Sequence, residues 1–139
     1  MKFVRVALLA ALAFWAAPAS ASSIVARIDI SEQTMRVFVD GMPRYTWKVS
    51  TARSGYWTPR GNYRAQRLEA MWYSRKYDNS PMPWSVFFNG GFAIHGTHSI
   101  SALGRPASHG CVRLHPANAQ ALFSLVRANM ASTQIIITQ

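Results

Sequence analysis

Apolar and polar residues alternate along much of the first half of this chain, and this pattern constrains the fold more than any other feature. The alternation is clearest in residues 26–30, 35–40 and 44–49. Successive side chains of a β-strand point to opposite faces, so each stretch predicts a strand with one buried face. Ser31–Gln33 and Asp40–Pro43 are short enough to connect these strands as hairpins. We therefore expect antiparallel pairing.

The remainder of the chain predicts more strands and one main helix. Strands are expected at residues 62–68, 84–89, 92–94 and 134–138. Pro116 suits a first helical position, and apolar residues follow it at helical spacing, so a helix should run from Pro116 to about Asn129. Leu68–Pro83 has no clean period and predicts a long loop or lid. The expected fold is mostly β, with mixed antiparallel sheets in a sandwich- or barrel-like arrangement.

The N-terminal residues 1–21 predict a signal peptide. Lys2 and Arg5 precede the apolar stretch Val6–Ala17, and Ala19-Ser20-Ala21 has the small-x-small pattern of a cleavage site. A retained membrane anchor is the alternative, but spanning a bilayer takes about 20 apolar residues. No later segment predicts a stable membrane span. We expect cleavage after about Ala21, a periplasmic location, and one domain formed by residues 22–139.

The chain is strongly basic. Its formal net charge of +10 falls to +8 when Lys2 and Arg5 leave with the signal. Such a surface attracts polyanions, although solubility alone would also explain it. For an exported protein, cell-wall polymers and lipid head groups are the expected polyanions, and nucleic acid is not an expected partner.

Cys111 is the only cysteine, so it cannot form a disulfide within the chain. It lies in Ser108-His109-Gly110-Cys111-Val112-Arg113, sixteen positions after His95. Nearby histidine and arginine favour a thiolate nucleophile, and backbone N–H groups of this run can stabilise an oxyanion. Glycines between His95 and Cys111 allow the chain to fold back and bring the two together. A buried, inert cysteine is the alternative.

These motifs resemble the L,D-transpeptidase catalytic domain (YkuD) family. The resemblance rests on His95-Gly96 followed by the Ser108–Arg113 run, with weaker support from Thr58–Tyr63 and Val49–Thr51. It extends over nearly all of the chain after about Ile24. One departure is Ala52, where the family usually has glycine.

The resemblance implies a catalytic role for three residues. Cys111 would be the nucleophile, and His95 would be the general base, oriented by a backbone carbonyl such as that of Gly96. His109 would line the site and support the loop and the thiolate.

The resemblance also implies substrate-binding positions at Arg113, Ser108 and Gly110. A guanidinium suits a substrate carboxylate, although a salt bridge within the loop is the alternative for Arg113. No metal or other cofactor is expected, because imidazole transfers the protons and backbone donors hold the charge.

The implied reaction is acyl transfer on peptidoglycan tetrapeptide stems. Cys111 would attack the carbonyl between the third residue, an L-centred diamino acid, and the terminal D-alanine, release D-alanine and hold the stem as a thioester. A stem amine would then form a crosslink, an amine of an envelope protein would attach that protein to the wall, and water would give carboxypeptidase activity. The acceptor and the oligomeric state stay open.

Two other functions are compatible with the residues. One is a zinc hydrolase that uses cysteine and histidine ligands, drawn from His95, His98, His109, Cys111 and His115. The other is a basic cell-wall-binding module with an inert cysteine. Taken singly, His98 is expected in a loop and His115 at the helix start. Trp72, Tyr73 and Trp84 are expected in the core or, alternatively, as an aromatic wall over the cleft.

Overall fold

A computed structural model describes residues 15–139. The predicted signal peptide lies mostly outside these residues, and residues 15–23 contain no helix or strand. Its cleavage after Ala21 stays a prediction. Ser22 is tied to the domain, because its amide donates to Asn129 Oδ1 at 2.7 Å. Within residues 15–139, no helix is long and apolar enough to cross a membrane.

The first sheet has five strands in the order β3-β2-β1-β9-β4. They are β1 (Ile24–Asp29), β2 (Thr34–Val39), β3 (Met42–Lys48), β4 (Gly61–Arg64) and β9 (Thr133–Thr138). The first three form the expected antiparallel meander. The C-terminal strand β9 pairs in parallel with β1 and antiparallel with β4, so the sheet is mixed.

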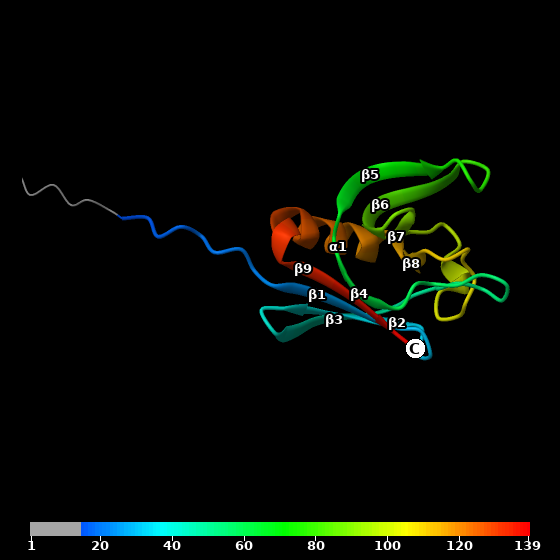
Figure 1. Ribbon diagram of the computed structural model, residues 1–139, viewed down its shortest axis with the longest axis horizontal. Helices are drawn as coiled ribbons and strands as arrows, with labels where there is room; N and C mark the ends of the chain where they lie inside the picture. Colours follow the sequence, from blue (N-terminus) through cyan, green and yellow to red (C-terminus); the bar gives the residue numbers. More distant parts are fainter. Residues whose placement is uncertain (1–14) are drawn as a thin grey trace, which may run out of the picture.

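The second sheet has four strands in the order β5-β6-β7-β8. They are β5 (Arg67–Ser74), β6 (Ser80–Asn89), β7 (Phe92–Gly96) and β8 (Val112–Leu114). The first three pair antiparallel, and β7 pairs in parallel with β8. The mostly β prediction is confirmed, and the arrangement is sandwich-like rather than a closed barrel (Figure 1).

The α-helix of the described residues, α1 (Pro116–Ala128), begins and ends where the sequence predicts. His115 is its N-cap, because the ring Nδ1 accepts a hydrogen bond from the Ala117 amide at 3.1 Å. The helix packs mainly against β6 and β7. Short 3-10 turns lie at Ile100–Ala102 and Met130–Ser132.

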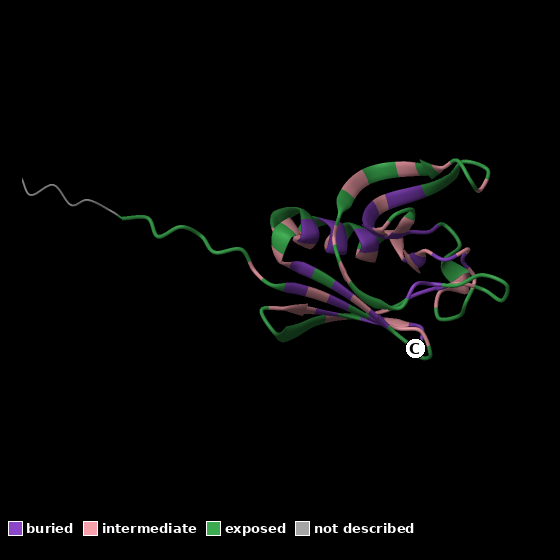
Figure 2. Cartoon of the chain, in the orientation of Figure 1, coloured by how far each residue is buried: buried purple, intermediate pink, exposed green. Residues whose placement is uncertain are grey.

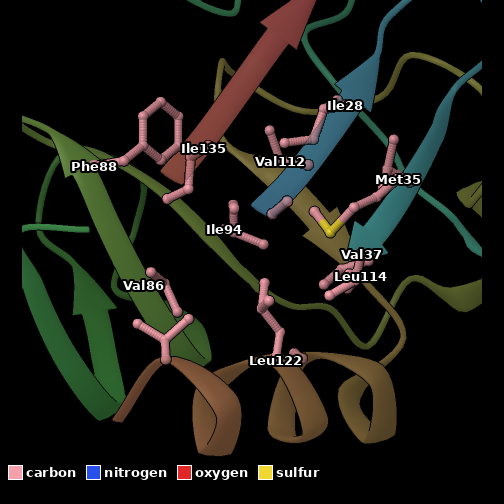
Figure 3. Packing of buried hydrophobic residues seen from close by; sticks show 14 of the residues in the cluster. Ile28, Met35, Val37, Val86, Phe88, Ile94, Val112, Leu114, Leu122 and Ile135 are labelled. Carbon is pink, nitrogen blue, oxygen red and sulfur yellow. The ribbon is translucent and has the colours of Figure 1, made fainter. Parts of the chain in front are cut away.

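The main hydrophobic core lies between the two sheets and α1. Figure 3 shows Ile28, Met35 and Ile135 of the first sheet facing Ile94 of the second sheet and Leu122 of the helix. The burial pattern in Figure 2 alternates along β1 and β9, as expected for strands with one face on the core. The apolar residues of α1 that face the core are Ala119, Leu122, Phe123 and Val126.

The prediction of a long loop at Leu68–Pro83 is wrong, because β5 and the first half of β6 form a hairpin there. The hairpin extends beyond the core, so few of its side chains are buried and the pattern that reveals a half-buried strand is weak (Figure 2). Pro81 and Pro83 fit because this part of β6 pairs only with β5 and leaves its other edge open. The single strand expected at residues 62–68 is two strands in different sheets.

The β5–β6 hairpin bends along its length (Figure 1). Its ladder skips the pair Ala70 and Trp84, and Trp84 has a φ of 56°, which is rare for a bulky residue. The Trp84 ring packs at 5.3 Å, edge to face, on Phe123 of α1. The kink is therefore fixed by a core contact, and beyond it the hairpin reaches the loops that follow β3 and β7.

Candidate active site

The parallel pairing of β7 with β8 brings the two principal candidate residues together. His95 lies directly opposite Arg113, and Cys111 immediately precedes β8. Residues two apart on a strand share a face, so Cys111, Arg113 and His95 all project on the same side of the sheet. This juxtaposition comes from two strands separated by a fifteen-residue loop.

His95 is buried, with 6% of its surface exposed, and its Nδ1 lies 2.7 Å from the carbonyl oxygen of Gly96. A proton on Nδ1 makes this a hydrogen bond and leaves Nε2 free to accept a proton. Burial lowers the pKa of His95 to about 4, outweighing the Gly96 hydrogen bond, which raises it. The imidazole is therefore neutral near neutral pH.

Gly96 also has a packing reason to be glycine. A Cβ at this position would lie 3.1 Å from Pro116 Cα and 3.2 Å from Pro83 Cγ. The end of β7 thus meets the start of α1 and the side of β6 at close range, which holds the backbone carbonyl that contacts His95.

The Cys111 thiol borders a small apolar cluster made by Met82, Phe87 and Ala93, with Trp72 partly buried beside it. Burial raises its pKa, opposed by a hydrogen bond from the Ala93 backbone and by the charge of Arg113. The sequence favours a thiolate, whereas burial here favours the protonated thiol. A neutral thiol beside a neutral imidazole needs proton transfer as the sulfur attacks.

The turn before Cys111 is held by side-chain hydrogen bonds. The Ser108 hydroxyl donates to the Cys111 carbonyl at 2.6 Å and accepts from the Gly110 amide at 3.0 Å. The Thr58 hydroxyl donates to the Gly110 carbonyl at 2.8 Å. Ser108 is buried and its hydroxyl holds the loop, while the residue also lines the cleft, so a substrate contact at Ser108 stays a prediction.

Gly110 adopts a backbone conformation that other residues avoid, with a φ of 136°. A Cβ there would lie 2.6 Å from Phe92 Cε1 and 2.9 Å from the Trp57 carbonyl oxygen. The chain therefore needs glycine immediately before the cysteine.

The Val49–Thr51 segment holds the other side of this loop. Ser50 and Arg113 exchange backbone hydrogen bonds at 3.0 and 2.9 Å, and the Thr51 carbonyl accepts from Ser108 at 2.9 Å. Ala52 is not among the positive-φ residues of the described chain. Alanine fits this backbone without strain.

His109 packs against two tyrosine rings, which also contact each other. Tyr77, at the tip of the β5–β6 hairpin, stacks on it with ring centroids 4.1 Å apart and an angle of 18°. Tyr56 meets it at 4.7 Å and 59°. Burial, followed by the charges of Arg53 and Arg113, lowers its pKa. His109 thus links the candidate catalytic loop, the Ser108–Gly110 segment before Cys111, to the hairpin, a contact that the sequence did not predict.

These residues border a cleft of about 750 Å³. Of the aromatic residues considered from the sequence, Trp72 lines this cleft, whereas Trp84 packs on the helix and Tyr73 is exposed elsewhere on the hairpin. His98 is an exposed loop residue at the edge of the cleft. The cleft also contains residues that the sequence did not single out for the site: Tyr56, Trp57, Arg67, Arg75, Lys76 and Tyr77.

Arg113 is half-buried and donates from Nη1 to the Ala107 carbonyl at 3.3 Å. Among residues 15–139, no carboxylate lies within ion-pair distance of it. The salt bridge considered for it is therefore not formed within the described chain, and the guanidinium lines the cleft.

The histidines do not gather into a metal site. Within the described part of the chain, no three His, Cys, Asp or Glu side chains form a group that could hold a metal ion. His115 is engaged as the cap of α1, away from the pair formed by His95 and Cys111. The arrangement gives the zinc alternative no support.

A sequence model of the L,D-transpeptidase catalytic domain matches residues 23–137. The chain belongs to the L,D-transpeptidase catalytic domain family. No curated protein sequence matches it significantly.

Solved L,D-transpeptidase structures are similar in fold. One from Mycobacterium smegmatis has 23% identity and a TM-score of 0.77, with 85% of this chain and 59% of that chain covered. One from Xylanimonas cellulosilytica has 27% identity and a TM-score of 0.73, covering 87% and 63%. One from Stackebrandtia nassauensis has 24% identity and a TM-score of 0.74, with 92% of this chain and 61% of that chain covered. The chain spans about three fifths of the length of these L,D-transpeptidases.

Proposed function

We propose that this protein is a cysteine-dependent L,D-transpeptidase of peptidoglycan tetrapeptide stems. The observation that carries the proposal is the placement of Cys111 and His95 on one face of the β7–β8 pair, at the cleft, with His95 Nδ1 held by the Gly96 carbonyl. This leaves Nε2 as the free base for the thiol. Family membership supports the substrate class.

In the first half-reaction, His95 Nε2 takes the thiol proton while Cys111 Sγ attacks the carbonyl carbon between the third stem residue and D-alanine. The amides of Ser108 and Gly110 already donate within the fold, to Thr51 and Ser108. The amides of His109 and Cys111 are therefore our candidates for stabilising the oxyanion. The C–N bond then breaks, His95 returns its proton to the departing amine, and a thioester forms.

In the second half-reaction, an acceptor amine attacks the thioester and loses a proton to His95, which passes it to the departing sulfur. A stem amine gives a crosslink, an amine of an envelope protein gives wall attachment, and water gives carboxypeptidase activity. The protein would act in the periplasm after removal of residues 1–21. Comparing wall composition in cells with and without the protein distinguishes crosslinking from protein attachment.

The decisive experiment is covalent labelling by a penem, followed by intact mass and peptide mapping. An L,D-transpeptidase from Mycobacterium tuberculosis has been crystallised with a faropenem-derived adduct. We expect one adduct on Cys111 in the wild type, none in Cys111→Ser and much slower labelling in His95→Gln. Labelling that persists in Cys111→Ser would overturn the proposal.

The same preparation tests the two alternatives. Stem turnover that survives a metal chelator and is abolished by a thiol alkylator contradicts the zinc hydrolase. A Cys111→Ser variant that binds peptidoglycan and retains every activity of the wild type would instead establish the wall-binding module.

A further inference from the structure

The charges that line the cleft are all of one sign. Arg67, Arg75, Lys76 and Arg113 contribute to its walls, and none of its lining residues is aspartate or glutamate. Arg75 and Lys76 come from the tip of the β5–β6 hairpin, whereas Arg113 comes from β8 beside Cys111. The positive charge therefore extends from the reacting thiol toward the mouth of the cleft.

Most of this charge is not neutralised by the protein. In residues 15–139 the ion pairs are Arg36 with Glu32 and Arg67 with Glu69, the latter at 3.0 Å. Arg67 is therefore paired, and its guanidinium also lies 3.8 Å from the centre of the Phe87 ring. No carboxylate of the described chain pairs with Arg75, Lys76 or Arg113, which leaves these three cations for a ligand.

The hairpin tip is positioned on the cleft. Tyr77 stacks on His109, and its carbonyl accepts hydrogen bonds from the Ser80 amide at 3.0 Å and the Ser80 hydroxyl at 2.7 Å. Lys76 Nζ lies 5.4 Å from the centre of the Tyr77 ring. A cation adjoining a ring that is itself packed on the catalytic loop is held near the cleft without a carboxylate.

We propose that Arg75 and Lys76 are specificity residues that, together with Arg113, select acyl donors whose stem carboxylates are free rather than amidated. The inference rests on the proposed function. The relevant groups are the α-carboxylate of the second stem residue and, in stems whose third residue is a diamino acid with a second carboxyl group, the side-chain carboxylate of that residue. Amidation keeps the shape of each group and removes its charge, so it tests charge recognition directly.

Four synthetic tetrapeptide donors distinguish the two carboxylates: both free, amidated at the second residue, amidated at the third, and amidated at both. The rate of acylation of Cys111 is followed by intact-protein mass spectrometry. We expect the wild type to prefer the fully free donor over the doubly amidated one by about tenfold or more, the scale of 1.4 kcal/mol or more. The singly amidated donors then show which carboxylate the cations recognise.

The test variant is Arg75→Gln with Lys76→Gln, and the matched control is Arg27→Gln with Arg44→Gln. Both remove two positive charges, but Arg27 and Arg44 do not line the cleft. The preference should fall by about threefold or more in the test variant, which retains Arg113, and persist in the control. Equal rates for all donors in the wild type, or an unchanged preference in the test variant, would overturn the inference and leave the proposed function intact. Absence of acylation by every donor would overturn both.

Discussion

Protonation of His95 should destabilise the folded protein, because burial keeps this imidazole neutral down to about pH 4. An unfolded chain binds a proton on histidine near pH 6.5. Between these pH values the unfolded state holds more protons than the folded state. The contribution of His95 to the free energy of unfolding is therefore complete above pH 6.5 and is lost as the pH falls toward 4. The difference between the two pKa values corresponds to about 3 kcal/mol.

Urea unfolding of the wild type and His95→Gln at about pH 7.5 and about pH 4.5 measures this contribution. Glutamine can still donate to the Gly96 carbonyl but does not titrate. On going from the higher to the lower pH, the free energy of unfolding of the wild type should fall by about 2.5 kcal/mol more than that of the variant. Titrations of other groups, such as Asp29, whose pKa is lowered mainly by a hydrogen bond from Ser31, occur in both proteins and cancel.

His98→Gln is the matched control, since His98 is exposed. The free energy of unfolding of His98→Gln should change with pH as that of the wild type does. If His95→Gln loses as much stability as the wild type on acidification, then His95 is not held neutral by burial. The same neutrality predicts that the acidic limb of kcat/KM lies near pH 4 rather than near 6.5, because the free enzyme's base then stays unprotonated.

Three further substitutions test the site. Tyr77→Leu should accelerate modification of Cys111 by a bulky thiol reagent several-fold, because the stack of Tyr77 on His109 is lost. Tyr73→Leu, an exposed position on the same hairpin, should leave the rate unchanged. Equal rates in the two variants would contradict the prediction. Gly110→Ala should lower the free energy of unfolding in urea by about 1–3 kcal/mol more than Gly104→Ala does. Both glycines have a positive φ, but only a Cβ at Gly110 would clash with backbone. Equal losses in the two variants would argue against the clash. Thr58→Val should lower the free energy of unfolding by about 1–3 kcal/mol and slow acylation. It removes a buried hydroxyl that accepts from the Ala52 amide and donates to the Gly110 carbonyl. An unchanged melting temperature and acylation rate would refute the prediction.

The sequence predicts best those elements that have one face on the core. The β1–β3 meander and α1 bury one face, so their periodicity is visible. β8 is only three residues long and has no period of its own. The parallel pairing of β1 with β9 joins the two ends of the domain, and nothing local in either strand specifies it.

The same distinction applies to the candidate site. His95 and Cys111 can be identified because each lies in a compact local motif with its own glycine. The contact of Tyr77 with His109 depends on where the hairpin tip arrives, which follows from the kink at Trp84 and its packing on α1. Because the hairpin looks like a loop in sequence, its aromatic and basic residues could not be placed at the cleft in advance.

Substitutions in the β7–β8 pair and substitutions at the tip of the β5–β6 hairpin should have different effects on the proposed reaction. Cys111 and His95 are fixed by the β7–β8 pairing and by backbone contacts at Gly96, so changes there should alter the reaction with every donor alike. Arg75 and Lys76 lie at the tip of the hairpin, which meets the catalytic loop through side-chain stacking. Substitutions at the tip can therefore change which donors are selected while the chemistry of the thiol and imidazole is retained. On the proposed function, the share of donor preference carried by Arg75 and Lys76 is thus separable from the acyl-transfer chemistry, whereas Arg113 lies on the same strand pair as the thiol and the imidazole.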